Sequence, residues 1–198
     1  YADLVRRLPV RGYDRLAPYV EEVKRGDLSA LFAPGVDLRM FALTSGTTGE
    51  PKYIPVTGPF VEDYRRGWNV FGLQALIDHP DAFFRKIVQI TSDGRESRTP
   101  GGHWCGAITG LLAETQKWIV RQYYVTPLAV AKIKDPRAKS YTVARLAVAE
   151  DVSFISTANP STVLRLAQTM AEHGLRLIRD VADGTLRPPG EVPPAVRA

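Results

Sequence analysis

A string of small and hydroxylated residues that ends in a lysine is the stretch of this sequence best suited to chemistry. Glycine lets backbone N–H groups approach anionic oxygens closely because no side chain intervenes, and serine and threonine hydroxyls add donors. The lysine supplies positive charge. These residue types in this order predict a loop that grips phosphate groups. Its candidate ligands are Thr44, Ser45, Gly46, Thr47, Thr48, Gly49 and Lys52, and Lys52 is also the candidate catalytic residue.

Apolar runs on both sides of the loop predict the elements that hold it. One run lies at 40–44, and Tyr53, Ile54 and Val56 follow the loop with alternating character. We therefore predict strands at 40–44 and 53–56, joined as a hairpin. Because a strand follows, the loop does not use a helix N-terminus as dinucleotide-binding and Walker loops do.

Two other interpretations of the loop are weaker. A Walker loop needs Gly-Lys-Ser/Thr after a four-residue spacer, and the spacer after Gly46 leads to Pro51-Lys52-Tyr53 instead, which argues against a P-loop NTPase. The other alternative is an ordinary turn with a solvated lysine. The length and order of the string between two apolar runs favour phosphate binding over that alternative.

Helical periodicity flanks the predicted hairpin. Apolar residues at positions 16, 19, 20 and 23 predict an amphipathic helix over 13–25, which Gly26 ends. Thr57 is a suitable N-cap for a long helix to residue 77. An apolar stripe on that helix predicts a buried face, although such a stripe can also line an acyl pocket. The stripe comprises Phe60, Val61, Tyr64, Trp68, Phe71, Ala75 and Leu76.

The second half of the chain alternates strands and helices. We predict strands at 87–91 and 152–156, and helical structure at 142–149. Asn159 as N-cap and Pro160 at the first helical position predict a helix to His173 that Gly174 ends, followed by a short helix over 174–184. The predicted buried face of the first comprises Val163, Leu164, Ala167, Met170 and Ala171. The alternation predicts the α/β class and one domain.

Composition narrows the classes of function. Hydrophobic content of 44% and charged content of 24% are ordinary for a globular protein. The net charge of +5 comes from scattered residues and no run of five or six like charges, so we expect no nucleic-acid partner. A single cysteine fits a reducing compartment, and no apolar run of about 18 residues suggests a membrane span. We therefore expect a cytoplasmic protein without a membrane partner.

Four further features are weaker candidates for function. His103 and Cys105 are too few for a zinc site, and we expect no metal ligand here. Cys105 as a nucleophile would need a positioned base. Arg65 and Arg66 could reach a carboxylate, but a solvated helix face is the simpler interpretation. The small residues at 99–102 and 107–110 form either the floor of a substrate channel or a plain turn.

The loop resembles the signature of the adenylate-forming superfamily, whose members use ATP to convert a carboxylic acid into an acyl-adenylate. Further segments, in this order, resemble one branch, the Gretchen Hagen (auxin-responsive) family of acyl-acid amido synthetases, known from plant auxin and jasmonate metabolism and present in bacteria. Plant members usually carry Ser-Ser-Gly-Thr-Ser, whereas the loop here is closer to the general superfamily form. The matching segments are Asp14 to Val20, Ser97 to Gly102, Asn159 to Ser161 and Asp183 to Leu186.

The resemblance implies an α/β fold that is part of a large N-terminal domain, with a mixed sheet and flanking helices. Residues 1–186 would be a partial adenylation domain, and 187–198 a proline-rich tail with no means to pack that leads into further sequence. ATP and Mg²⁺ are the implied cofactors, and a carboxylic acid and an amine, such as an amino acid, the implied partners. We expect adenine, ribose and magnesium ligands in a missing C-terminal part of the enzyme. The alternatives are an acyl-CoA ligase and a non-catalytic fragment.

Overall fold

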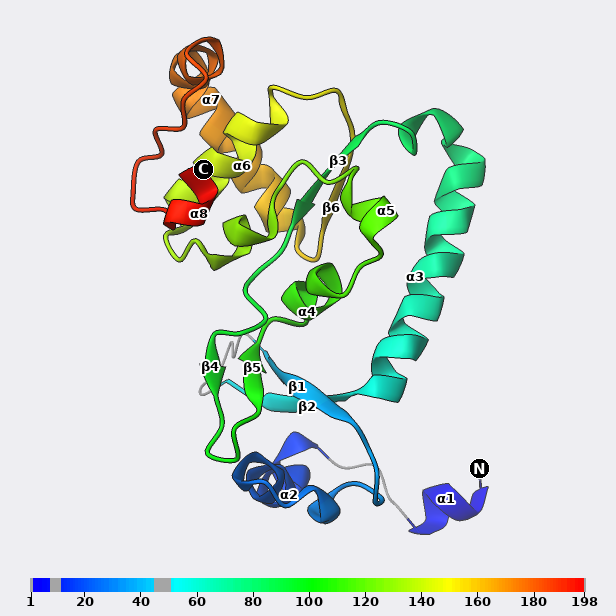
Figure 1. The fold of residues 1–198 in the computed structure, drawn as a ribbon. Coiled ribbons are helices and arrows are strands. Elements are labelled where there is room, and N and C mark those ends of the chain that lie inside the picture. The colour runs from blue at the N-terminus through cyan, green and yellow to red at the C-terminus, as the bar shows by residue number, and fades with distance from the viewer. Residues whose placement is uncertain (1, 8–11, 45–50, 198) are drawn as a thin grey trace. The chain divides into compact units, whose positions relative to one another are not determined.

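The chain divides into two compact units in a computed structural model that describes residues 2–7, 12–44 and 51–197. The hairpin unit comprises Tyr1–Glu62 and Arg95–Gly106. The parallel-sheet unit comprises Asp63–Gly94 and Ala107–Ala198. Both units combine strands with helices, which confirms the predicted α/β class (Figure 1).

The hairpin unit is built on a four-stranded mixed sheet of order β2-β1-β5-β4. β1 (Leu38–Leu43) pairs antiparallel with β2 (Tyr53–Thr57), which confirms the predicted hairpin. β5 (Trp104–Gly106) runs parallel to β1, and β4 (Ser97–Arg98) runs antiparallel to β5. Among the described strands of this sheet, β2 is therefore an edge strand with β1 as its neighbour on one side and no strand on the other.

One helix packs on this sheet through a narrow apolar face. α2 (Tyr13–Arg25) begins and ends where the sequence predicts, and Gly26 takes φ 112°, a left-handed conformation that suits glycine at the end of a helix. Val20 and Val23 are buried against Phe41 and Cys105, whereas Leu16 and Tyr19 are exposed. Only two of the four predicted apolar positions are therefore buried against the small sheet that α2 covers.

Residues 97–106 form the hairpin of β4 and β5. Its turn is closed by hydrogen bonds between Thr99 and His103, including one from the His103 N–H to Thr99 Oγ1 of 3.1 Å. Of the two interpretations of 99–102, this geometry supports the plain turn. The Gly101 N–H donates to the carbonyl of Lys24 at 2.8 Å, and a Cβ on Gly101 would lie 2.7 Å from the nitrogen of Gly26. Only glycine permits this close approach to the end of α2.

The long helix after the hairpin forms as predicted, but its apolar stripe is not buried. α3 spans Gly58–Asp78, and the Phe60 N–H donates to Thr57 Oγ1 at 3.4 Å. Trp68 and Phe71 are about half exposed and pack edge-to-face on each other at 5.5 Å between ring centroids. Apolar residues at positions 70, 73 and 77 are exposed as well. The burial prediction was wrong because apolar side chains lie on more than one side of this helix, so no single face can be buried against one neighbour.

The parallel-sheet unit contains a pair of parallel strands, β3 (Lys86–Ile90) and β6 (Val152–Thr157). Both strands were predicted, and Ile155 on β6 is exposed. α6 (Pro136–Ala147) packs on β3 and on α7 (Pro160–Ala182), and α7 packs on β6 (Figure 1). α6 begins earlier than predicted because Asp135 caps it, accepting a hydrogen bond from the Arg137 N–H at 2.8 Å.

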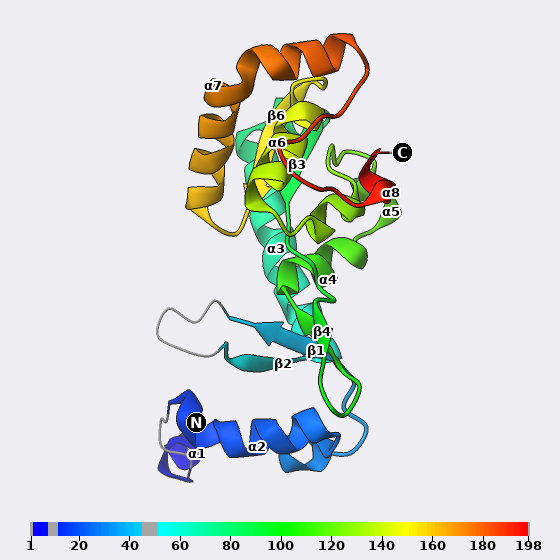
Figure 2. The ribbon, with the colours of Figure 1, turned by 90° about the vertical axis from the view of Figure 1, so that its left-hand side faces the viewer.

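The core of this unit contains Val88, Val130, Tyr141, Val143, Leu166 and Leu177. The two helices predicted on either side of Gly174 form a single segment, bent at His173, where φ is −113° and ψ is 15° (Figure 2). Leu166, Leu177 and Asp180 are its buried residues. The apolar face predicted for 160–173 was wrong: Leu164 is 60% exposed, and Val163, Ala167, Met170 and Ala171 are also exposed. A different face of the helix, which includes Leu166, contacts the core.

The C-terminal segment packs, contrary to the expectation for a proline-rich tail. Leu186, Val192 and Val196 lie against the core of the parallel-sheet unit. Val196 belongs to the short helix α8 (Pro194–Arg197). The apolar side chains of this proline-rich segment contact the core, and the proline content alone did not predict this packing. The remaining elements are α1 (Ala2–Arg7), α4 (Ile108–Glu114), α5 (Trp118–Arg121) and short 3-10 helices at Leu28–Ala30, Pro80–Ala82 and Leu128–Lys132.

Two leucines test this assignment of the core. Leu177 is 2% exposed and Leu73 is 60% exposed. We expect Leu177→Ala to lower the free energy of unfolding by about 3 kcal/mol, because it leaves a cavity in the core. We expect Leu73→Ala to change it by less than about 0.5 kcal/mol. Urea denaturation of both variants measures the difference, and equal losses would contradict the assignment.

Candidate phosphate-binding hairpin

Thr44 and Lys52 close the neck of the β1–β2 hairpin. The Thr44 N–H donates to the Lys52 carbonyl at 3.1 Å, and the Lys52 N–H donates to Thr44 Oγ1 at 3.3 Å. The ladder continues directly below them with the pair Leu43 and Tyr53. The two ends of the predicted phosphate string therefore lie side by side, with Lys52 at its base and both side chains exposed. The other predicted ligands, Ser45, Gly46, Thr47, Thr48 and Gly49, lie outside the described residues.

A tyrosine from α2 binds the outer edge of the same hairpin. Tyr13 Oη donates to the Tyr53 carbonyl at 3.3 Å and accepts from the Tyr53 N–H at 3.1 Å. The hydroxyl thereby serves both backbone groups of the first residue of β2, as a donor and an acceptor at once. Lys52 Nζ lies 5.4 Å from the centroid of the Tyr13 ring, within the range of a cation–π contact.

A second lysine lies on the neighbouring ring. Lys24 Nζ is 3.8 Å from the centroid of Tyr53 and 2.7 Å from Glu21 Oε1. Its backbone carbonyl accepts from Gly101. Lys24 therefore helps to seat the end of α2 against the sheet. Sequence patterns do not indicate these roles of Lys24 and Tyr13, because helical periodicity identifies apolar positions and not the polar contacts of a helix with a strand edge.

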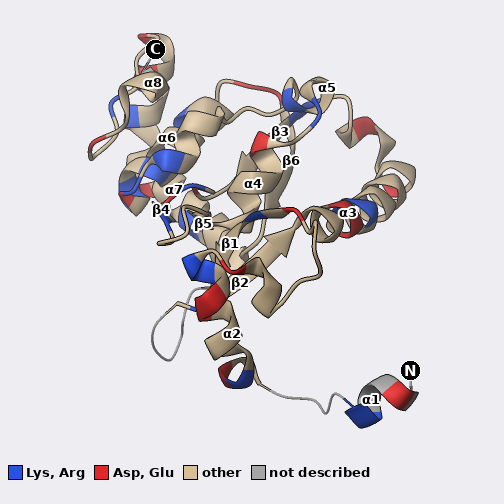
Figure 3. Ribbon diagram, turned by 60° about the horizontal axis from the view of Figure 1, so that its bottom comes forward, with Lys and Arg blue, Asp and Glu red and all other residues tan. Residues whose placement is uncertain are grey.

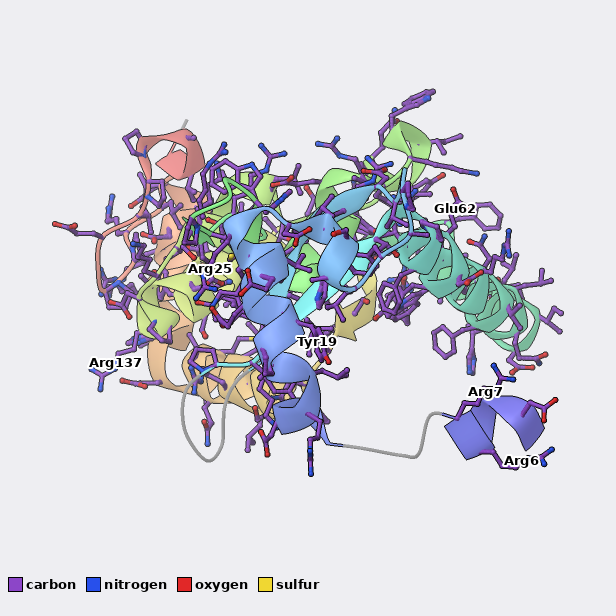
Figure 4. All side chains as sticks on the ribbon, turned by 90° about the horizontal axis from the view of Figure 1, so that it is seen from below. Arg6, Arg7, Tyr19, Arg25, Glu62 and Arg137 are labelled. Atoms are coloured by element: carbon purple, nitrogen blue, oxygen red, sulfur yellow. The ribbon has the colours of Figure 1, made fainter. Side chains whose placement is uncertain are left out.

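Charge on α2 is balanced rather than of one sign. Glu21 pairs with Lys24, and Glu22 pairs with Arg25 at 2.7 Å. Acidic and basic segments accordingly lie next to each other along the helix (Figure 3). Arg25 lies at the C-terminal end of α2, and the exposed Tyr19 lies near its middle (Figure 4).

The other candidates take structural roles. Cys105 is buried in the core of the hairpin unit, and burial raises the pKa of its thiol, which disfavours the nucleophilic thiolate. The His103 ring lies edge-on to Phe41 at 6.2 Å. Arg65 donates to the Thr115 carbonyl at 2.6 Å, and Arg66 pairs with Asp63 on its own helix. In the described part of the chain, no three His, Cys, Asp or Glu side chains gather in a way that could hold a metal ion.

The sequence of the chain matches a known protein family. A family model described as the GH3 family N-terminal domain matches residues 1–198. The chain belongs to the GH3 family. This confirms the resemblance to the Gretchen Hagen family drawn from the motifs, and it extends over the whole sequence.

Relatives of the GH3 chain are longer than it is. It is 21% identical over 187 residues to a protein from Oryza sativa subsp. japonica that carries the name of an indole-3-acetic acid-amido synthetase, GH3.10, covering 92% of this chain and 38% of that protein. Its fold is similar to that of the GH3.15 acyl acid amido synthetase, with a TM-score of 0.71 at 22% identity over 91% of this chain and 32% of that one. A structure of AtGH3.15 in complex with 2,4-DB gives a TM-score of 0.69 at 20% identity, covering 87% of this chain and 30% of that one.

The GH3 chain therefore spans less than two fifths of each of these relatives. The similarity of fold supports the mixed sheet with flanking helices that the sequence predicted. No helix in the described ranges combines the length and apolar character that crossing a membrane requires.

Proposed function

We propose that this GH3 chain supplies the phosphate-gripping part of an ATP-dependent ligase that joins a carboxylic acid to an amine, such as an amino acid. The observation that carries the proposal is the closed hairpin neck, where Thr44 and Lys52 meet at the two ends of the phosphate string. Membership of the GH3 family, whose named relatives are acyl acid amido synthetases, supports the same reaction class.

In the proposed reaction a carboxylate oxygen attacks the α-phosphorus of ATP, and pyrophosphate leaves with the bonding electron pair. The amine nitrogen then attacks the acyl carbon, AMP leaves, and the amine loses a proton. Both steps depend on positioning and on neutralising charge. The residues at 44–49 would donate hydrogen bonds to the phosphates, and the Lys52 ammonium would stabilise the negative charge that develops on pyrophosphate.

Mg²⁺ belongs to the proposed reaction as a phosphate-bound cofactor, but this chain offers no described site for it. The side chains of the described residues do not provide three grouped metal ligands. We therefore assign no Mg²⁺ ligand here, and the proposed role of this chain rests on hydrogen bonds and on one ammonium group.

Two substitutions in the full-length enzyme test the loop. We expect Lys52→Ala and Thr47→Ala each to slow ATP–pyrophosphate exchange by about tenfold to a hundredfold, because each removes a donor to the phosphates worth about 1.5–3 kcal/mol or less. Thermal melting should change little, since the Lys52 side chain is exposed. Unchanged exchange in both variants would contradict the assignment of the loop.

An acceptor screen separates the proposed amide ligase from an acyl-CoA ligase. Both would share the first half-reaction, so pyrophosphate exchange cannot tell them apart. Incubation of the full-length enzyme with ATP, an acid that supports exchange, and either amino acids or coenzyme A would do so. We expect amide products detected by mass spectrometry. Thioester products alone would overturn the choice of acceptor and leave the role of the loop intact.

A further inference from the structure

The Lys52-Tyr53 dipeptide is bound on both sides at the point where the phosphate string returns to the sheet. The backbone of Lys52 pairs with Thr44, toward β1. The backbone of Tyr53 faces the open edge of β2, where another strand would otherwise pair. The Tyr13 hydroxyl takes that place by pairing with both the N–H and the carbonyl of Tyr53.

The same tyrosine also contacts the side chain of Lys52. The Lys52 ammonium lies 5.4 Å from the Tyr13 ring centroid. A lysine has a flexible four-carbon stem, and a solvated lysine samples many rotamers. An aromatic face within about 6 Å attracts the ammonium and restricts this sampling. Tyr13 thus restrains Lys52 in two ways. Its hydroxyl is hydrogen bonded to the backbone of the next residue, Tyr53, and its ring contacts the Lys52 ammonium group.

We propose that Tyr13 is a positioning residue for Lys52, which it holds beside the hairpin neck before phosphate arrives. The proposal rests on the phosphate role of Lys52 given above. A preplaced ammonium loses less freedom when it meets the phosphates, so its interaction with the leaving pyrophosphate is stronger in the transition state. The resemblance segment Asp14 to Val20 begins one residue after this tyrosine, which the motif comparison left without a role.

Two variants separate the contributions of the hydroxyl and the ring. Tyr13→Phe keeps the aromatic face and removes the two hydrogen bonds to Tyr53. Tyr13→Leu removes both. Tyr19 offers a matched control, because it lies on the same helix, is 52% exposed and lies nearer the middle of α2 (Figure 4). Tyr19→Phe and Tyr19→Leu should behave like the parent protein in every measurement.

Nuclear magnetic resonance of the full-length protein tests the contact without any turnover. Reductive ¹³C-methylation labels lysines and keeps their charge, and Lys52→Arg assigns the Lys52 signal. We expect this signal to be shifted upfield by the Tyr13 ring, to stay shifted in Tyr13→Phe and to lose the shift in Tyr13→Leu. An identical Lys52 signal in the parent and in Tyr13→Leu would overturn the contact.

Phosphate binding and kinetics test the positioning role. Titration with pyrophosphate, followed through the Lys52 signal, should give a dissociation constant about three- to tenfold higher in Tyr13→Leu and an intermediate one in Tyr13→Phe. In pyrophosphate exchange we expect kcat to fall by a similar factor, with a smaller change in KM for ATP. Equal affinity for pyrophosphate in the parent and Tyr13→Leu would overturn the role.

The outcomes keep the two proposals apart. If the parent enzyme exchanges pyrophosphate and the Tyr13 variants match it in kcat and in affinity, the positioning role fails and the proposed ligase stands. If the parent binds pyrophosphate through Lys52 but shows no exchange with any acid, the proposed ligase fails, and the titration still decides whether Tyr13 positions Lys52. A fall in melting temperature without a change in the Lys52 signal would mean a purely structural tyrosine and would also overturn the inference.

Discussion

The 198-residue chain on its own is expected to fold yet to show no measurable pyrophosphate exchange. Each unit has its own apolar core, centred on Val20, Val23 and Phe41 in one and on Val88, Tyr141 and Leu177 in the other. A chain of this length can bury enough apolar surface for cooperative folding. We therefore expect a sigmoidal thermal transition.

Catalysis demands more than these two units are proposed to supply. The chain covers 38% of the rice relative and 32% of the GH3.15 structure, and only the phosphate string is assigned to it here. Without contacts to the base, the metal ion and the acyl group, the reactants are no longer held in an attacking geometry. Loss of such orientation lowers a rate by about 10⁵-fold or more. That loss would place exchange below detection.

The assay is pyrophosphate exchange with the purified chain over a panel of aryl and alkyl acids, run beside a thermal melt. The full-length protein, under the same conditions, is the control that shows which acids are substrates. Exchange by the 198-residue chain at a rate near that of the control would show that it contains a complete site. A melt without a transition would refute independent folding.

Local rules predicted the elements of the GH3 chain well. The hairpin of β1 and β2, the helices α2 and α3 and the parallel strands β3 and β6 all follow from periodicity, capping residues and glycine. Which face each helix buries did not follow. On α7 the predicted apolar stripe is exposed, and Leu166, Leu177 and Asp180 are buried instead. Burial depends on the partner surface, which a single periodic pattern does not encode.

The candidate site was predictable only in its chemistry. The residue types at 44–52 predicted a phosphate-binding loop with Lys52 as its charged residue. The apolar runs on either side predicted two strands, and the structure shows them paired as a hairpin. Tyr13 lies 40 positions from Tyr53, to which it is hydrogen bonded. No local pattern connects them, because the contact arises from packing α2 beside an edge strand. Contacts of this kind need the tertiary fold before they can be predicted.

Substitution of Asp180 is also expected to have a large effect, here on the free energy of unfolding. No sequence pattern indicated this role of Asp180. Its side chain lies near the C-terminal end of α7, is fully buried and accepts three hydrogen bonds. Tyr141 Oη and the Arg187 N–H donate to Oδ2, each at 2.8 Å, and Thr185 Oγ1 donates to Oδ1 at 3.1 Å. The carboxylate therefore joins α6, α7 and the segment after α7. Burial acts to raise the pKa of Asp180, but these hydrogen bonds and the nearby Arg187 hold that pKa below its usual value.

Asp180→Ala would leave three donors without their acceptor in the core of the parallel-sheet unit. The Tyr141 hydroxyl is buried, whereas the Thr185 hydroxyl and the Arg187 N–H are only partly buried. An unsatisfied buried donor costs about 1–3 kcal/mol and a partly exposed one less, so we expect the free energy of unfolding to fall by about 4 kcal/mol. Asp180→Asn keeps the shape and one acceptor oxygen but points an amide donor at another donor, so its loss should be smaller. Tyr141→Phe removes a single hydrogen bond and should cost least. Urea denaturation of the three variants at neutral pH measures this order.

The pH dependence of stability checks that the charge of Asp180, and not only its shape, carries the effect. A carboxyl group whose pKa is lower in the folded than in the unfolded state stabilises the fold above its unfolded pKa, which is ordinarily 3.8. That stabilisation is lost as the pH falls from about 4 through the folded pKa.

At alkaline pH the group that matters is Tyr141. Burial and then the bond to Asp180 raise the pKa of Tyr141 to about 12, so the contribution of Tyr141 to stability is full below about pH 10 and lost toward pH 12. We expect Asp180→Asn to weaken the acid dependence and Tyr141→Phe to weaken the alkaline dependence. Profiles that match the parent protein in both variants would show that neither group titrates with folding.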